Sequence, residues 1–362
     1  MDELLAVGSY TAATGGRGSG VALLVRGAAT GRLGSVRAVD PCDSPSFLAA
    51  GPAGALHAAH ELDEGVVSTR RFEPEPGGAV GAGRWRVLGE APSGGASPCH
   101  LAVHPGGRLL AVANYGGSVG LVAAPGGAAA ELVQVLAHPG SGPRADRQEA
   151  SHPHSVTFLD PATLLVADLG TDELRLHRVD PATGRAGDEP VQRVRTPPGC
   201  GPRHVALTGG PGARALHVAG ELDATLLSLP VLDGPGGARL GRPVVHPALL
   251  GAAPGPVHPS EVAVLGPGRV VVANRGADVL TVHDVSGGAA RPVADVPLGA
   301  GNPRHLRVLP RAGGGAHLYV SAQDSDLVVH LALDGDLAVV DRSVAAVGSP
   351  TFVLPFPAAA AR

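Results

Sequence analysis

The chain contains no lysine and no isoleucine, so every basic residue apart from histidine is an arginine. Schiff-base catalysis and the phosphate-binding P-loop both depend on a lysine, and the sequence therefore excludes these two mechanisms. The roughly 18 consecutive apolar residues of a membrane-spanning helix are also missing. The opening stretch, MDELLAVGSYT, has acids where a signal peptide has a basic region. We expect a cytoplasmic protein that does not bind membranes.

The chain also has few cysteines and a small net charge. The three cysteines, Cys42, Cys99 and Cys200, are widely spaced and form no CxxC pair, which argues against a disulfide framework and against a zinc knuckle. The formal net charge is −4 over 362 residues and no basic run occurs, so nucleic acid is not expected as a partner. A hydrophobic fraction of 44% is typical of a globular chain that buries a substantial core.

What the chain does have is an internal repeat. An apolar segment that ends in a small or polar residue and a turn recurs at intervals of roughly fifty residues, a period typical of stacked or circular repeat folds. Its seven copies are AVGSYT (6–11), HAAHELDEG (57–65), AVANYGG (111–117), LVADLGTD (165–172), HVAGELD (217–223), VVANRGAD (271–278) and YVSAQDSD (319–326).

A second series runs in phase with the first. Each copy is a proline, two variable residues and an alternating apolar run typical of a β-strand. The seven copies are SPSFLA (44–49), SPCHLAV (97–103), HPHSVTF (152–158), GPRHVAL (201–207), HPSEVAV (258–264), NPRHLRV (302–308) and SPTFVL (349–354). Turn signals such as HPGGR (104–108) and GPGR (266–269) separate the two series.

These patterns predict an all-β fold: a seven-bladed β-propeller with four-stranded antiparallel blades around a central channel. A long β-sandwich would not explain a period that persists through the whole chain. We expect a single domain over residues 1–362. Because free edges would expose unpaired strand groups, we also expect the segment 351–356 to pair with the N-terminal strand and close the ring.

If the Pro-x-x motifs open the innermost strands, their side chains converge on one mouth of the channel. Residues from these motifs are Ser46, His100, His154, Arg203, His204, Glu261, Arg304, His305 and Thr351. Turns of the first series add Glu61, Tyr115, Asp168, Glu221, Arg275 and Asp324. A concave site with convergent polar groups is a natural binding site. The alternative is that these side chains only cap strand ends by hydrogen bonding to neighbouring backbone.

The residue types indicate anion recognition with proton transfer. Three arginines offer planar donor forks suited to a carboxylate or a phosphate: Arg203, Arg275 and Arg304. His154, with an ordinary pKa near ~6.5, can act as base or acid around neutral pH. Glu221 and Glu261 can serve as a base, as the orienter of a histidine, or as ion-pair partners of the arginines.

Two other motifs carry less weight. GGSVG (116–120) matches the G-x-S-x-G nucleophile elbow, but an elbow leads from a strand into a helix and strand-like residues follow here, so Ser118 is interpreted as structural. His152 and His154 flank a proline and could both face a metal ion, yet no third ligand is evident. No metal and no cofactor are expected.

The residues of both series resemble those of the lactonase family of seven-bladed propellers, whose usual representative is bacterial 6-phosphogluconolactonase. The resemblance covers essentially the whole chain, through VGSYT, SPCHLAVHPGGRLLAVANYGG, QEASHPHSVTF, GPRHVAL with GELD, VVANRGAD and NPRHLRV. It implies hydrolysis of a sugar lactone, most simply 6-phosphogluconolactone, in carbohydrate catabolism and without a metal. The family is also similar to a fungal propeller that cyclises a carboxymuconate.

Carried over by motif, the catalytic residues implied by the resemblance are His154, Arg203, Glu221 and Arg275. We expect the arginines, with Arg304, to hold a phosphorylated or carboxylated lactone and its oxyanion. His154, oriented by Glu221 or Glu149, would activate water. His100, His204, Glu261 and His305 are expected to bind substrate, together with Arg304. Gly220 stands where similar sequences often have Asn, which predicts a looser loop before Glu221.

Two alternatives stay open at this point. A cycloisomerase that forms a lactone from an unsaturated diacid would use the same arginines and the same proton-transfer groups. A non-catalytic propeller would bind a protein or a small anion at its channel mouth, because the fold alone does not imply catalysis. We expect a monomer, since a closed propeller is complete as one chain.

Overall fold

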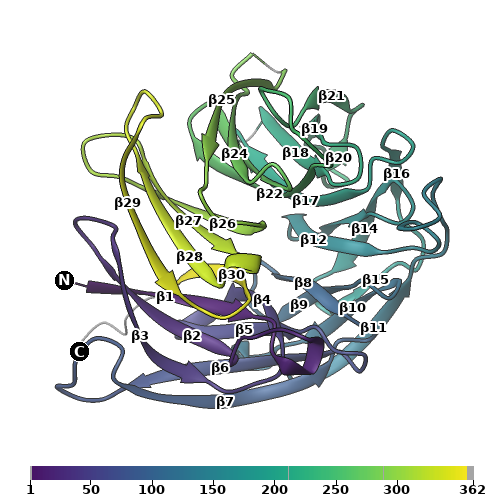
Figure 1. Cartoon of the computed structure of the whole chain (residues 1–362). Coiled ribbons are helices and arrows are strands. Elements are labelled where there is room, and N and C mark those ends of the chain that lie inside the picture. The colour runs from purple at the N-terminus through teal and green to yellow at the C-terminus, as the bar shows by residue number, and fades with distance from the viewer. Residues whose placement is uncertain (1, 211, 288, 357–362) are drawn as a thin grey trace.

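A computed structural model describes residues 2–356 except 211 and 288. The chain forms seven antiparallel sheets arranged in a ring, and the innermost strands of all seven meet around its centre (Figure 1). The predicted seven-bladed β-propeller is confirmed. Figure 1 also shows the first and last strands of the described residues, β1 and β30, side by side in one blade.

The strands of the first four blades in the chain are as follows, each blade given from the channel outward. The blade with both chain ends is β30 (Pro350–Phe356), β1 (Asp2–Ser9), β2 (Val21–Gly27) and β3 (Leu33–Asp40). Next come β4 (Pro45–Ala50), β5 (Ala55–His60), β6 (Val66–Pro74) and β7 (Gly83–Pro92). Then follow β8 (Pro98–Val103), β9 (Leu109–Asn114), β10 (Ser118–Ala123) and β11 (Glu131–Ala137). The fourth blade is β12 (Pro153–Asp160), β13 (Thr163–Asp168) and β14 (Glu173–Asp180), with the short β15 (Arg185–Ala186) and β16 (Gln192–Arg195) outside.

The remaining three blades follow the same order. They are β17 (Pro202–Thr208), β18 (Arg214–Gly220) and β19 (Thr225–Leu232) with the short β20 (Arg239–Leu240) and β21 (Val244–Pro247); β22 (His258–Gly266), β23 (Arg269–Arg275), β24 (Val279–Asp284) and β25 (Arg291–Pro297); and β26 (Pro303–Pro310), β27 (Ala316–Ala322), β28 (Leu327–Leu333) and β29 (Val339–Ala346). In two blades the outermost position is therefore shared by two short strands that both pair with the third strand.

Short 3-10 turns occur at Ala12–Thr14, Pro52–Gly54, Pro125–Gly127 and Gln323–Ser325. The ring is joined by antiparallel pairing of β1 with β30, with Leu4 opposite Phe356 and Ala6 opposite Leu354. This pairing removes the free edge that both terminal strands would otherwise expose.

Small aliphatic side chains fill the space between the blades. The second strand of a blade is buried on both faces, as in Leu109–Asn114, where every residue is buried. The clusters between neighbouring blades consist mainly of valine, leucine and alanine. Packing of this kind accounts for a chain with only 2% aromatic residues, because branched aliphatic residues pack well on a pleated surface.

Four histidines lie inside the blades and remain uncharged there: His57, His177, His217 and His330. Burial lowers the pKa of each to about 4. In the unfolded chain a histidine titrates near ~6.5. The unfolded state therefore binds more protons than the folded state between these two pH values, and folding loses stability as the pH falls through this window.

We therefore expect the contribution of these histidines to the free energy of unfolding to be level above pH ~6.5 and to fall toward pH 4, with each histidine adding a slope of up to about 1.4 kcal/mol per pH unit. Urea unfolding at several pH values between 7.5 and 4.5 measures this slope. A free energy that stays level from pH 7 to pH 5 would contradict the assignment of these histidines as neutral in the folded protein.

Candidate active site

The Pro-x-x motifs open the innermost strands, and a β-bulge follows the proline in most of them. In β8, for example, Pro98 faces Asn114 and His100 faces Ala113, so Cys99 is the extra residue of the bulge. The pairings of β4, β12, β17, β22 and β26 shift at the same place. A bulge re-aims side chains beside a site, and here it turns the two residues after the proline toward the channel.

These two positions form two layers. Where the first residue after the proline is small, its side chain stays between the blades, and Ser260, for example, donates to the carbonyl of Pro303 in the next blade. Where it is long, its side chain reaches groups at the channel mouth, and this holds for His154, Arg203 and Arg304. The second residues form a separate layer farther along the channel.

Glu221 is the centre of the first layer. It follows β18 and is 3% exposed. Its Oε1 accepts a hydrogen bond from Arg147 at 2.7 Å. Its Oε2 lies 2.9 Å from Nε of Arg203 and 2.9 Å from Nη2 of Arg275. One carboxylate thus joins arginines from β17, β23 and the loop before β12.

Charge keeps Glu221 ionised in spite of its burial. Burial by itself would raise the pKa of Glu221, but the charges of Arg275, Arg203 and Arg147 together bring this pKa well below its ordinary value. Arg203 is the largest fully buried side chain and also donates to the carbonyl of Ser260. Burial and the charge of Arg275 lower the pKa of Arg203 to about 10, so Arg203 stays protonated at neutral pH.

The loop before Glu221 is tightly packed, which corrects the expectation that Gly220 loosens it. A Cβ on Gly220 would lie 2.3 Å from Oγ1 of Thr225 and 2.7 Å from Sγ of Cys200. The backbone N–H of Glu221 donates to Gly201 at 3.0 Å. In the blade of Asn274, the asparagine side chain holds the equivalent turn by donating to Ala248 and Thr281. Gly220 leaves that space to Thr225 and Cys200.

We expect the variant Gly220→Asn to be less stable than the wild type by a few kcal/mol, roughly the 1–3 kcal/mol of overpacking, and to displace Glu221. Chemical denaturation measures the loss. Gly255→Asn is a matched control, because a Cβ at Gly255 would meet nothing within 4 Å. Equal stability of the two variants would contradict this account of the loop.

His154 lies beside this charged group as a neutral base. It is 6% exposed, and its Nδ1 lies 3.9 Å from Sγ of Cys99. Burial, and next the positive charge of Arg203, hold the pKa of His154 well below its ordinary value, while Glu221 acts in the opposite direction. His154 is therefore uncharged around neutral pH and is free to accept a proton.

Glu149 does not orient His154. Its Oε1 lies 3.1 Å from Nε2 of the neighbouring His152, whose Nδ1 contacts the carbonyl oxygen of Tyr115 at 2.7 Å. The two histidines are separated because His152 precedes β12, whereas His154 is the bulged residue and faces the channel. The expectation that Glu149 is an orienter is therefore wrong, and Glu221 is the carboxylate near His154.

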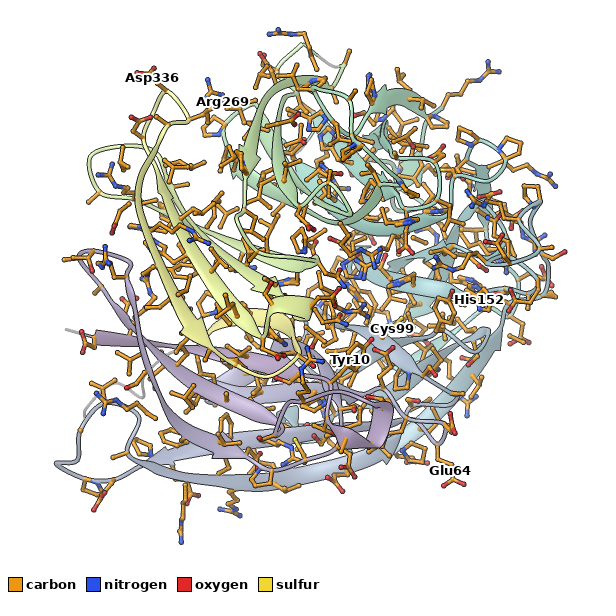
Figure 2. The ribbon with its side chains drawn as sticks, in the orientation of Figure 1. Tyr10, Glu64, Cys99, His152, Arg269 and Asp336 are labelled. Atoms are coloured by element: carbon orange, nitrogen blue, oxygen red, sulfur yellow. The ribbon has the colours of Figure 1, made fainter. Side chains whose placement is uncertain are left out.

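Arg304 forms a second charged group on the same side of the channel. It donates to the hydroxyl of Tyr10, and its guanidinium carbon lies 4.9 Å from the centre of the Tyr10 ring. Tyr10 in turn donates to Glu61 at 2.8 Å, and Glu61 lies 4.0 Å from Arg304. Figure 2 shows Tyr10 and Cys99 near the centre of the ring, in contrast to Glu64 and Asp336 at its periphery.

The second layer holds the other predicted binding residues and adjoins His154, whose ring centre lies 5.3 Å from that of His204. In this layer Nδ1 of His204 lies 2.9 Å from Oε2 of Glu261, and Nε2 of His305 lies 3.5 Å from the same oxygen. His100 packs against Phe47 with ring centres 4.0 Å apart. The bulge explains this division, since it places the first residue after each proline at the mouth and the second one deeper.

Some residues expected at the mouth, among them Asp168 and Asp324, have structural contacts instead. Asp168 accepts hydrogen bonds from Ser151 and from the backbone of His152, inside its own blade. Asp324 accepts a hydrogen bond from Asn302. Ser118 donates to Gly94 and accepts from Asn114, as expected for a structural serine. Ser46 and Thr351 are buried and their hydroxyl groups have no partner within the described residues.

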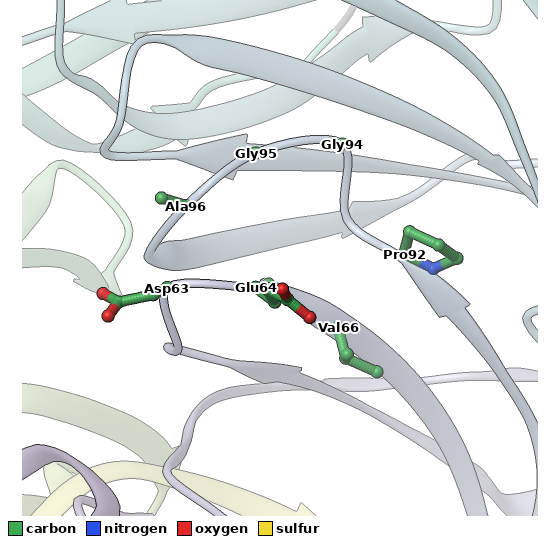
Figure 3. A pocket seen from close by; sticks show the side chains of 8 residues that line it. Asp63, Glu64, Val66, Pro92, Gly94, Gly95 and Ala96 are labelled. Atoms are coloured by element: carbon green, nitrogen blue, oxygen red, sulfur yellow. The ribbon is translucent and has the colours of Figure 1, made fainter.

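Two hollows flank the turn after β5 that contains Asp63. One, of about 450 Å³, is lined by Tyr10, Glu61 and Asp63 together with Thr14 and Ser97. The other, of about 400 Å³, lies between the turn of Asp63 and Glu64 and the facing segment Gly94–Ala96 (Figure 3). Neither lining contains a basic residue among the described residues, so neither hollow offers a positive charge to an anion.

No group of three or more His, Cys, Asp or Glu side chains in the described part of the chain is arranged to hold a metal ion. None of its helices is long and apolar enough to cross a membrane. The groups at the mouth are a neutral histidine, an ionised carboxylate and arginines. This set can bind an anion and move a proton without a metal.

The fold and the mouth define a seven-bladed propeller with an arginine-rich, histidine-containing site. The chain belongs to the lactonase family: the family model described as "Lactonase, 7-bladed beta-propeller" matches residues 4–355. It is an enzyme of the lactonase type.

Three similar proteins illustrate this membership. The uncharacterized protein YwcC of Lactococcus lactis is 28% identical over 290 residues, 79% of each chain. A 6-phosphogluconolactonase of Formosa agariphila is 26% identical over 231 residues, 61% of this chain and 63% of that one. The periplasmic gluconolactonase PpgL of Pseudomonas aeruginosa has a TM-score of 0.83 at 25% identity and covers 99% of this chain and 100% of its own.

Tyr10 and Arg147 were not predicted as site residues. Tyr10 lies in the turn of the first repeat copy, AVGSYT, so the phase of the repeat was a usable signal for it. Arg147 lies in the long segment before β12, outside both repeat series, and carries no pattern that distinguishes it from other surface arginines.

Proposed function

We propose that the protein hydrolyses 6-phosphogluconolactone to 6-phosphogluconate at the mouth of the channel, as a step of carbohydrate catabolism in the pentose phosphate pathway. The observation that carries the proposal is the charge of the mouth. Four arginines, Arg147, Arg203, Arg275 and Arg304, share two carboxylates, Glu221 and Glu61, and surround a neutral His154. The excess positive charge suits a phosphorylated lactone.

In the binding step, the arginines face the anionic group of the substrate and the carbonyl oxygen of the lactone. Arg203 and Arg275 are held by Glu221 and by the carbonyls of Ser260 and His258. Their positions are therefore fixed before the substrate arrives. Fixed donors that face the developing oxyanion stabilise the transition state more than the ground state.

In the chemical step, a water oxygen bonds to the lactone carbonyl carbon while the imidazole of His154 takes a proton from that water. The carbonyl electron pair moves onto the oxygen, next to the arginines. When the tetrahedral intermediate collapses, the bond between the carbonyl carbon and the ring oxygen breaks. The imidazolium returns its proton to that ring oxygen, which leaves as a hydroxyl. Glu221 stabilises the transient positive charge on His154.

An unphosphorylated gluconolactone is the second candidate, because PpgL covers the whole chain and is described as a gluconolactonase. The hollow beside Tyr10, Glu61 and Asp63 contains only neutral and acidic side chains and would favour sugar hydroxyls over a phosphate. The cycloisomerase reaction would require an unsaturated diacid at the same arginines.

The test is kcat/KM for three substrates, each corrected for its spontaneous reaction: 6-phosphogluconolactone, gluconolactone and carboxymuconate. The proposal predicts the highest value for the phosphorylated lactone and a lower value for gluconolactone. A higher kcat/KM for gluconolactone would show that the neutral sugar lactone is the preferred substrate. Conversion of carboxymuconate, without hydrolysis of either lactone, would show that the protein forms a lactone instead of opening one. Binding of phosphogluconate without any turnover would support a non-catalytic propeller.

We also propose that the protein acts in the cytoplasm as a monomer, with a small anionic lactone and no nucleic acid as its partner. The absence of a basic run supports the last point. Light scattering coupled to gel filtration gives the mass in solution, and cell fractionation separates a cytoplasmic from a periplasmic location.

A further inference from the structure

A further cavity lies beyond the mouth, along the inner strands. It has a volume of about 430 Å³, within the roughly 300–1,000 Å³ of typical small-molecule sites. We call it the lower chamber; its lining is Phe47, His100, His204–Leu207, Glu261–Val264, His305–Val308 and Phe352. The lining runs from the second layer to the ends of β17, β22 and β26, so the chamber lies toward the face opposite the mouth.

The inner end of the lower chamber is a cluster of buried titratable groups that the proposed hydrolysis does not use. Glu261 is flanked by His204 at 2.9 Å and by His305 at 3.5 Å. Nε2 of His204 is buried and has no hydrogen-bond partner among the described residues, although the His204 side chain is only 5% exposed. Buried polar groups normally have partners, so an unpartnered one at a cavity points to a ligand or water that completes it.

The outer end of the lower chamber carries an unpaired arginine. Arg307 is exposed and lies two residues after His305 on β26, so both side chains point to the channel side of the strand. Arg307 has no ion pair and no side-chain hydrogen bond within residues 2–356, leaving aside 211 and 288. The arginines at the mouth all have carboxylate neighbours, so Arg307 differs from them.

The charges around the lower chamber favour an anion. The positive charges of Arg203 and Arg307 act on Glu261 and on His305. Among the described residues, Glu261 is the only acid in the lining. Burial raises the pKa of Glu261 to about 8 in spite of Arg203, so this carboxyl is mostly protonated at neutral pH and can donate a hydrogen bond.

We propose that the lower chamber is a second binding site, which adjoins the mouth where His204 meets His154, for a small carboxylate that enters from the opposite face. The carboxylate pairs with the guanidinium of Arg307. The hydrogen-bonding groups of His204, Glu261 and His305 contact the body of the ligand. This proposal does not depend on hydrolysis at the mouth, because it concerns binding alone.

The experiment is isothermal titration calorimetry with D-gluconate as the probe and sorbitol as a neutral probe of the same carbon length. Gluconate can also bind at the mouth, so the titration is repeated with Arg275→Ala, which weakens the mouth, and with Arg307→Ala, which weakens the chamber. Arg269→Ala is the matched control, since Arg269 is an exposed arginine that does not line the chamber. Thermal unfolding checks that each variant is folded.

We expect gluconate to bind Arg275→Ala and Arg269→Ala at the chamber with wild-type affinity, and Arg307→Ala with roughly tenfold lower affinity there. Sorbitol should not bind. Loss of all gluconate binding in folded Arg275→Ala would overturn the proposal, and so would unchanged chamber binding in Arg307→Ala. The activity of the wild type toward lactones affects neither outcome, so failure of the chamber and failure of the proposed function are distinguishable.

Discussion

Replacement of Glu221 by alanine is expected to lower the free energy of unfolding by about 3–5 kcal/mol and to abolish activity. The carboxylate is the common partner of Arg147, Arg203 and Arg275. Arg203 is fully buried, so removal of the carboxylate leaves a buried positive charge without compensation. Removal of one partner of a buried ion pair is among the most destabilising single changes.

Urea unfolding of Glu221→Ala and of Glu189→Ala measures the effect. Glu189 is the control because it forms an exposed pair with Arg193, and such pairs contribute at most about 1 kcal/mol. Glu221→Gln keeps the side-chain volume and removes only the charge, so it separates the electrostatic loss from a packing loss. A Glu221→Gln variant as stable as the wild type would show that the arginines do not need this charge.

Replacement of His154 by alanine is expected to lower kcat by about 10²–10⁴-fold, the usual contribution of a general acid–base group, while the protein stays folded. Steady-state hydrolysis and thermal unfolding measure the two quantities. His104→Asn is the control, because His104 follows the C-terminal end of β8, away from the mouth, and its Nε2 lies 2.8 Å from the carbonyl oxygen of Pro161. Wild-type turnover in a folded His154→Ala variant would remove His154 from the mechanism.

The pH profile provides an independent check on the same residue. A base must be unprotonated to act, and burial together with Arg203 lowers the pKa of His154 below its ordinary value. We therefore expect kcat/KM to remain level as the pH falls through 6.5 and to decrease only at more acidic pH. A decrease centred near pH ~6.5, the ordinary value for a histidine, would mean that the base is more exposed than the structure places it.

The fold could be predicted because each blade repeats the same local signals. The turn after Asn114 and the turn after Asn274 have the same residues before them, and both asparagines hold their turns by hydrogen bonds to the next strand. Such signals lie within a few residues of one another in sequence. Seven copies in order leave little freedom in the architecture, and the propeller is confirmed.

The site could be predicted only in part. Repeat phase placed His154, Arg203, Glu221 and Arg275 on the channel side, and the structure brings them together. The depth of each side chain along the channel could not be predicted. It depends on a β-bulge, and the register of that bulge is visible only in the pairing with the next strand. The roles of these residues, and of the separate layer with Glu261, remain predictions.

The measurement that tests the central claim most directly is the rate of acid release from freshly prepared 6-phosphogluconolactone at neutral pH, with and without the protein. The proposal predicts a rate that rises in proportion to protein concentration, saturates with substrate and falls to the spontaneous value with His154→Ala. A rate equal to the spontaneous one in the presence of folded wild-type protein would contradict hydrolysis of this lactone at the channel mouth.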